Sequence, residues 1–142
     1  VFPQVLSYVI PVYKNESVDE ISQAILNLLP EAEIEAEEAE GLLEDKILIL
    51  TGVVSKKRYT KDFFNKLLQS TDLEKLNNDL EQKMDEKGNW FLRFDKNDAL
   101  DEKLTVLDKG DSIHLKVKIA AFPAKKQIAV DKVREAIDSF KN

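Results

Sequence analysis

The spacing of hydrophobic residues divides the chain into short strands and amphipathic helices. A period of two residues predicts a half-buried strand, because neighbouring side chains of a strand point to opposite faces. The clearest example runs from Ile113 to Ile119, where apolar residues alternate with His114, Lys116 and Lys118. This period, together with β-branched and aromatic content, predicts five strands, over residues 5–10, 31–38, 47–54, 90–95 and 113–119.

Helices are predicted where apolar residues recur every three or four positions after a capping residue. Ser17-Val18-Asp19-Glu20 is a capping box that opens a helix stopped by Pro30. Thr71-Asp72-Leu73-Glu74 is a second capping box, for a helix that ends before Gly88. Further helices are predicted over 60–69, capped by Thr60, and over 128–140, with a polar turn or short helix around 98–102.

These elements predict a single α+β domain spanning residues 1–142. The mostly antiparallel sheet has about five strands, with helices packed on one face. Residues 47–54 are almost continuously apolar, which favours a central strand, and residues 31–38 are expected to pair beside them. Pro11 limits the first strand to a sheet edge, or ends it.

Charge is distributed unevenly along the chain. The net charge is −6, whereas a basic surface is the expected footprint of a nucleic-acid-binding protein. Residues 31–45 alone contribute −8, however, so the remainder sums to +2. Residues 46–142 carry 20 basic and 16 acidic side chains, which leaves room for a basic surface away from the acidic segment.

Several classes of function find no support in the sequence. The absence of Cys excludes disulfides, thiolate zinc sites and cysteine nucleophiles, and suits a reducing cytoplasm. The longest apolar run, 47–54, is too short to span a bilayer. His114, the only histidine, lies on an ordinary strand, and a metal-dependent enzyme would need several convergent carboxylates from the alternating glutamates at 31–37. We therefore expect no enzyme activity, no metal and no cofactor.

The best candidate for a binding surface combines two of the predicted strands. In strand 90–95, Trp90, Leu92 and Phe94 point toward the core, while Phe91 and Arg93 point away from it. In strand 113–119 the outward residues are His114, Lys116 and Lys118. If both strands share one sheet, its solvated face offers a ring that can stack on a base and cations that can hold phosphates. Lys56-Lys57-Arg58 and Lys125-Lys126 could widen this surface.

In a competing interpretation, the lysines of strand 113–119 bind no ligand. Lys116 and Lys118 are ordinary on a half-exposed strand, and pairs with Glu33, Glu35 or Glu37 on a neighbouring strand would neutralise the face. Arg93 and Asp95 lie two residues apart, so Asp95 could hold Arg93 locally.

The segment Trp90-Phe91-Leu92-Arg93-Phe94-Asp95-Lys96, with Gly88 before it, resembles a short archaeal family of predicted RNA-binding proteins or exosome-associated subunits. The resemblance covers nearly the whole chain. It includes Leu6 to Leu29 followed by Pro30, an acidic strand ending at Glu40-Gly41, and an apolar strand that closes on a basic cluster, Lys46 to Arg58. Asn97 departs from the pattern, which has Gln there. The resemblance implies a fold like that of ribosomal protein five of the large subunit, and it marks Arg93 and Lys96 as binding residues.

We therefore expect a non-catalytic RNA-binding or RNA-processing accessory protein, cytoplasmic and associated with the exosome, whose partners are RNA and RNA-processing proteins rather than a membrane. The expected RNA-binding residues are Arg93, Lys96, Phe91, Lys116, Lys118, Lys56, Lys57 and Arg58. The alternative is a protein–protein adaptor or homodimer that docks a basic partner through the acidic segment 31–45.

Overall fold

The computed structural model describes residues 3–40 and 46–142, so residues 41–45 of the acidic segment lie outside the described residues. The described elements are β1 (Pro3–Val12), α1 (Val18–Leu28), β2 (Glu35–Glu40), β3 (Lys46–Val54), α2 (Lys57–Ser70), α3 (Leu73–Lys83), β4 (Asn89–Phe94), α4 (Lys96–Leu100), β5 (Val106–Leu107), β6 (Ile113–Ile119) and α5 (Lys126–Lys141). The α+β prediction is confirmed.

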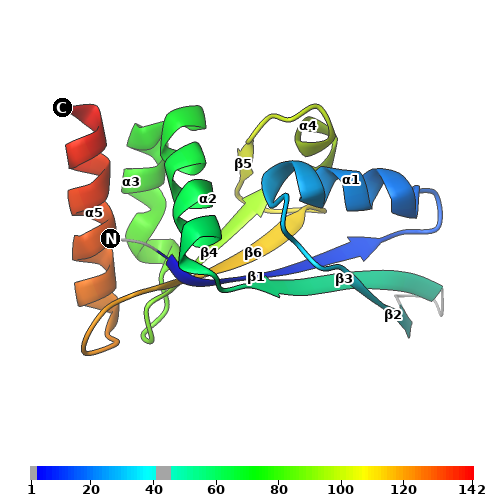
Figure 1. Ribbon diagram of the computed structural model, residues 1–142, viewed down its shortest axis with the longest axis horizontal. Helices are drawn as coiled ribbons and strands as arrows, with labels where there is room; N and C mark the ends of the chain where they lie inside the picture. The colour runs from blue at the N-terminus through cyan, green and yellow to red at the C-terminus, as the bar shows by residue number, and fades with distance from the viewer. Residues whose placement is uncertain (1–2, 41–45) are drawn as a thin grey trace.

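The strands form one open sheet in the order β2-β3-β1-β6-β4-β5, and every neighbouring pair is antiparallel. The described part of the chain contains six strands rather than about five, because the two-residue β5 adds to the edge of β4. Helices α1 to α4 lie on one side of the sheet and α5 packs beside α3, while no helix of the described chain covers the opposite face (Figure 1).

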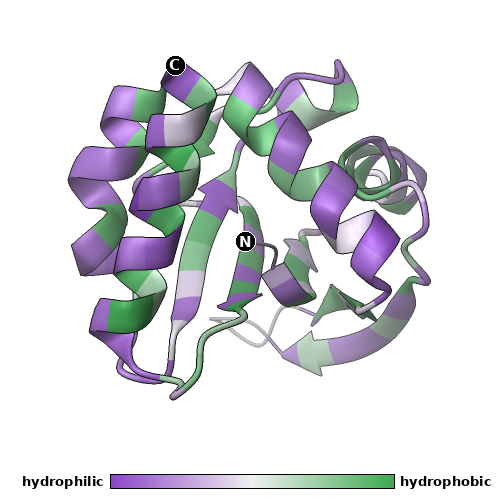
Figure 2. Cartoon of the chain, turned by 60° about the vertical axis from the view of Figure 1, so that its left-hand side comes forward, coloured by the Kyte–Doolittle hydropathy of each residue, from purple (hydrophilic) through white to green (hydrophobic). Residues whose placement is uncertain are grey.

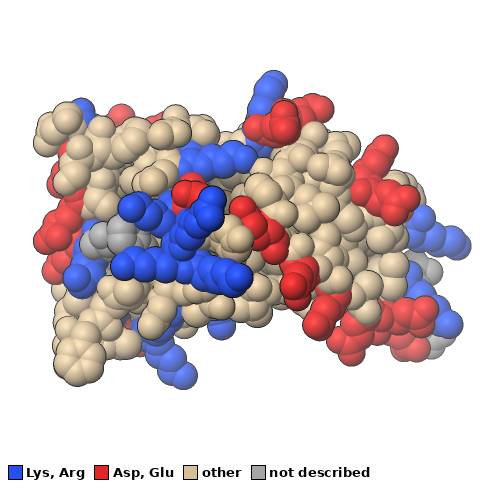
Figure 3. Space-filling model, in the orientation of Figure 1, with Lys and Arg blue, Asp and Glu red and all other residues tan. Residues whose placement is uncertain are grey.

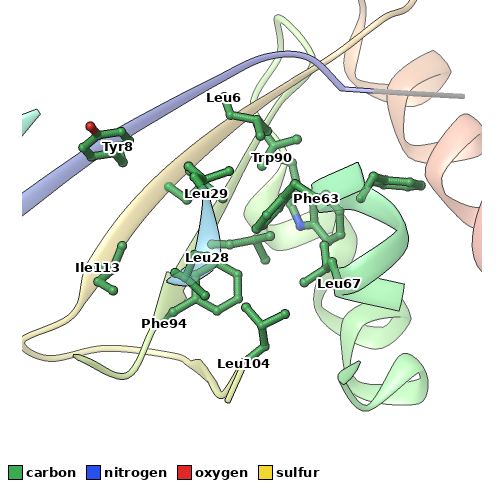
Figure 4. Close-up of a cluster of buried hydrophobic side chains, with 14 of the residues drawn as sticks. Leu6, Tyr8, Leu28, Leu29, Phe63, Leu67, Trp90, Phe94, Leu104 and Ile113 are labelled. Atoms are coloured by element: carbon green, nitrogen blue, oxygen red, sulfur yellow. The ribbon is translucent and has the colours of Figure 1, made fainter. Parts of the chain in front are cut away.

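The core lies between the sheet and these helices. Trp90, Leu92 and Phe94 are all buried, as the period-2 pattern predicts. Figure 4 shows Trp90 and Phe94 of β4 facing Phe63 and Leu67 of α2, and the rings of Phe63 and Phe94 meet edge to face with centroids 6.2 Å apart. Hydrophobic and hydrophilic residues alternate along the strands (Figure 2).

The first strand lies in the middle of the sheet, between β3 and β6. Pro11 fits there because the pairing of β1 with β6 ends at Val9, so near its end β1 pairs with β3 alone. Proline has no N–H to give to a second ladder. The prediction that Pro11 marks a strand end is confirmed, since β1 ends one residue later.

Two predicted N-cap residues are wrong. Helix α2 begins at Lys57 rather than after Thr60, whose hydroxyl instead donates to the Lys57 carbonyl at 3.1 Å within the helix. The N-cap of α3 is Asp72, which accepts from the backbone N–H groups of Glu74 and Lys75. Thr71 donates back to the Leu67 carbonyl at 2.6 Å and so belongs to the end of α2. The N-cap predicted at Ser17 is confirmed.

Candidate nucleic-acid interface

The helix-free side of the sheet, called the open face below, is built from alternate residues of its central strands. The register places Phe91 beside Lys116, which is beside Ser7, which is beside Val53. A parallel row runs from Arg93 to His114, Val9 and Thr51. Strands 90–95 and 113–119 therefore share one sheet as direct neighbours, and the predicted ring and cations come together.

Phe91 and Lys116 form an accessible pair on the open face. The Phe91 side chain is 46% exposed although it is large and apolar, and Lys116 is exposed beside it. Directly opposite residues in an antiparallel pair hold their Cβ atoms about 5 Å apart. A base stacked on Phe91 would thus bring its phosphate within reach of the Lys116 ammonium.

Arg93 is oriented by its neighbours but not neutralised by them. Its Nη1 donates to the Gly110 carbonyl at 3.1 Å and lies 3.3 Å from His114 Nε2. Asp95 does not hold Arg93, because Asp95 is the N-cap of α4 and accepts from the Asp98 N–H at 2.9 Å. The guanidinium therefore retains donors for an anion.

His114 supports Arg93 as a neutral imidazole. Burial, and then the positive charge of Arg93, lower the pKa of His114 below its ordinary value of 6.5. Lys96 acts in the same direction and Asp111 opposes it. A neutral ring can accept from Arg93 through Nε2, so Arg93 carries the positive charge of this pair at pH 7.

Lys118 and Lys96 differ from the other predicted cations. The Lys118 ammonium lies on the open face but donates to the Lys87 carbonyl at 2.6 Å. Lys96 is only 5% exposed and is not on the open face: its ammonium contacts the Pro11 carbonyl at 2.6 Å, Glu16 at 2.9 Å and Asp111 at 2.8 Å. This geometry favours a structural role for Lys96, away from the open face.

Lys56, Lys57 and Arg58 lie at one end of the sheet rather than on the open face. They form the N-cap and first residues of α2, directly after β3, and all three are exposed. The Lys56 ammonium lies 5.9 Å from the centre of the Tyr59 ring. These cations are therefore not part of the open face.

The competing interpretation, in which glutamates pair with the β6 lysines, is wrong. Strand β2 pairs with β3, which places Glu35 beside Thr51 and Glu37 beside Ile49. Two whole strands, β3 and β1, separate the acidic strand from β6. Figure 3 shows the same division on one side of the molecule, with acidic side chains along β2 and basic ones gathered toward the opposite end of the sheet.

A cleft of about 840 Å³ opens on this face, within the size range of sites that hold small ligands. Its floor includes Val9, Phe91, Arg93, His114 and Lys116, and the end of α3 and β5 form its rim. Sequence reasoning missed Val9, which is exposed, because the position of β1 beside β6 cannot be read from alternation alone. Among the described residues, no three His, Asp or Glu side chains gather as a metal site requires.

Comparison with known proteins connects this geometry to a family. A family model described as RNA binding matches residues 6–119. The chain belongs to this RNA-binding family. It is 31% identical to the RNA-binding protein PAB1135 of Pyrococcus abyssi over 136 residues, an alignment that covers 89% of this chain and 88% of that protein. The sequence-based resemblance to archaeal RNA-binding proteins is thereby confirmed.

Solved structures share the fold of this RNA-binding family member. Mth689 of Methanothermobacter thermautotrophicus, a DUF54 protein, superposes with a TM-score of 0.89 at 34% identity, covering 96% of this chain and 99% of that one. AF2318 from Archaeglobus fulgidus superposes with a TM-score of 0.83 at 25% identity, covering 94% and 98%. No helix in the described part of the chain is long and apolar enough to cross a membrane.

Proposed function

We propose that this chain is a non-catalytic RNA-binding protein that holds unpaired RNA on the open face. The observation that carries the proposal is the register of β4 and β6, which sets the exposed Phe91 beside Lys116 and Arg93 beside His114. Phe91 supplies a stacking surface, and Lys116 and Arg93 supply charges for phosphates. Membership of the RNA-binding family supports the choice of ligand.

Unpaired RNA fits this surface better than a duplex does. The cleft is lined by apolar groups such as Val9 and Phe91, which suit the flat faces of splayed bases. Bases inside a helix are already stacked on one another and cannot use such a surface. The acidic β2, which two strands separate from β6, would repel phosphates and so favour a path along β4 and β6.

The finer parts of the proposal come from the sequence resemblance. We include a role as an RNA-processing accessory protein in the cytoplasm, association with the exosome, and a relation to the fold of ribosomal protein five. Binding to RNA-processing proteins can be tested separately from RNA binding, by co-purification with the open-face variant described next.

The test is a fluorescence anisotropy titration of single-stranded RNA at 50 and 200 mM salt. The variant Arg93→Ala/Lys116→Ala removes two open-face charges, and Lys103→Ala/Lys141→Ala removes two exposed charges elsewhere. We expect saturable binding that weakens with salt, is lost in the first variant and is retained in the second. Equal loss in both variants, or no binding at 50 mM salt, would refute the proposal.

A second candidate function uses the opposite edge of the sheet. Strand β2 is an edge strand, and its residues Glu35, Glu37, Glu38 and Glu40 are exposed. Such an edge can pair with an added strand of a basic protein, as in an adaptor. Titration with a labelled lysine-rich peptide tests this function, and sedimentation tests homodimerisation. Saturable peptide binding without RNA binding would favour the adaptor.

A further inference from the structure

Two chain segments leave the sheet at the same end. Val54, the last residue of β3, pairs with Leu6 of β1, and Ile119, the last residue of β6, pairs with Pro3. The start of α2 and the segment 120–125 before α5 therefore both lie directly after the end of the sheet at which β1 begins. Figure 1 shows α2 and α5 rising from that end.

This end of the molecule carries two groups of cations, one at the start of α2 and one at the start of α5, which together we call the basic end: Lys56, Lys57, Arg58, Lys125 and Lys126. All but Lys126 are exposed, and Lys126 is half-buried. The first turns of α2 and α5, both within the described residues, hold no acidic side chain. Figure 3 shows basic side chains gathered near the start of α2. Neighbouring like charges repel one another, so a polyanion is the partner that this surface fits.

Phe122 is an exposed aromatic residue in the same segment. Its side chain is 97% exposed, and it precedes Lys125 by three residues. A fully solvated Phe ring contributes nothing to the core, whereas such a ring beside cations can stack on a base. The basic end thus offers stacking and charge without the apolar cleft of the open face.

We propose that the basic end binds double-helical RNA that continues from the unpaired segment on the open face. This inference rests on the function proposed above. A duplex presents two closely spaced rows of phosphates, which a cluster of cations can contact without reading bases. Phe122 stacks on the last base pair, where the helix ends and the unpaired strand begins. The ligand class is therefore a junction between duplex and single-stranded RNA.

The test uses anisotropy with four fluorescein-labelled RNAs: a single strand, a hairpin without an overhang, a hairpin with a 5′ overhang and a hairpin with a 3′ overhang. The variants are Lys56→Ala/Lys57→Ala/Arg58→Ala, Phe122→Ala and, as a matched control, Lys14→Ala/Lys103→Ala/Lys141→Ala. All of the replaced side chains are exposed. Circular dichroism confirms that each variant is folded.

We expect one overhang hairpin to bind the wild type at least about tenfold more tightly than the single strand, because two linked contacts reinforce each other. The basic-end variant should remove this advantage and leave single-strand binding unchanged. Three phosphate contacts correspond to roughly a 40-fold loss of RNA affinity when salt rises from 50 to 200 mM. The basic-end variant should not show this part of the salt dependence. Phe122→Ala should weaken only junction binding, and Phe122→Tyr should restore it.

The two proposals fail in different ways. If the wild type binds single-stranded RNA through Arg93 and Lys116 but shows no preference for a junction, the inference alone falls. The inference also falls if the basic-end variant weakens binding of the single strand and of the junction equally. It falls as well if the control variant weakens junction binding as much as the basic-end variant does. If the wild type binds none of the RNAs, both proposals fall.

Discussion

Replacing Lys96 with alanine is expected to destabilise the fold without weakening RNA binding. The ammonium joins the Pro11 carbonyl, Glu16 and Asp111 at 2.6 to 2.9 Å, and so ties the start of α4 to β1 and to the turn before β6. Hydrogen bonds to a charged group contribute about 1.5–3 kcal/mol each. Glu16 and Asp111 retain 22% and 44% exposure, so water replaces part of what they lose. We expect the free energy of unfolding to fall by about 2–4 kcal/mol.

Urea unfolding followed by circular dichroism measures this loss, with Lys103→Ala as the control at an exposed position. For a chain of this length the melting temperature should fall by roughly 6–16 °C. RNA affinity, measured well below the melting temperature, should equal that of the wild type. A change of less than about 0.5 kcal/mol, accompanied by loss of RNA affinity, would refute the structural assignment and place Lys96 in the interface.

Three further changes test other parts of the account. Gly52→Ala should lower the free energy of unfolding by about 1–3 kcal/mol. A Cβ at this position would clash with the Tyr8 hydroxyl and lie 2.6 Å from the Glu33 carbonyl oxygen. An unchanged midpoint of urea unfolding would contradict this. Because the pKa of His114 is lowered on folding, the unfolded chain takes up the proton first as pH falls below about 6.5. The free energy of unfolding should therefore decrease as pH falls below that value. The variant His114→Gln should show a smaller decrease over the same pH range. Phe91→Ala should weaken single-stranded RNA binding by about 1–3 kcal/mol per stacked base, and Phe91→Tyr should retain it.

Much of the fold could be predicted because the local patterns are strong. Strand β6 was predicted with its observed bounds, since Ile113 to Ile119 alternate without interruption. Strand β5 was missed because two residues carry no period. The start of α2 was misplaced because Lys56 supplies no capping side chain, whereas Thr60 looks like one. Capping rules detect helices with a side-chain cap and miss those without.

The candidate site could be predicted only in part, because faces follow from alternation but neighbours do not. Alternation placed Phe91, Arg93 and Lys116 outward, and the pairing of β4 with β6 brought them together. The position of β1 in the middle of the sheet separates β2 from β6, so the glutamates of β2 do not pair with the lysines of β6. Lys96 follows the strand in sequence, yet the chain turns into α4 there and buries its ammonium. Long-range pairing of this kind is not encoded in a local period.

The most direct test of the central claim is a titration of the ¹⁵N-labelled protein with single-stranded RNA, followed by amide chemical shifts. We expect the shifts to concentrate in β4, β6 and β1, with Phe91, Arg93, Lys116 and Val9 among the residues affected. Shifts confined to β2 or to the helices α1 and α3, or no shifts at saturating RNA, would contradict binding through the open face.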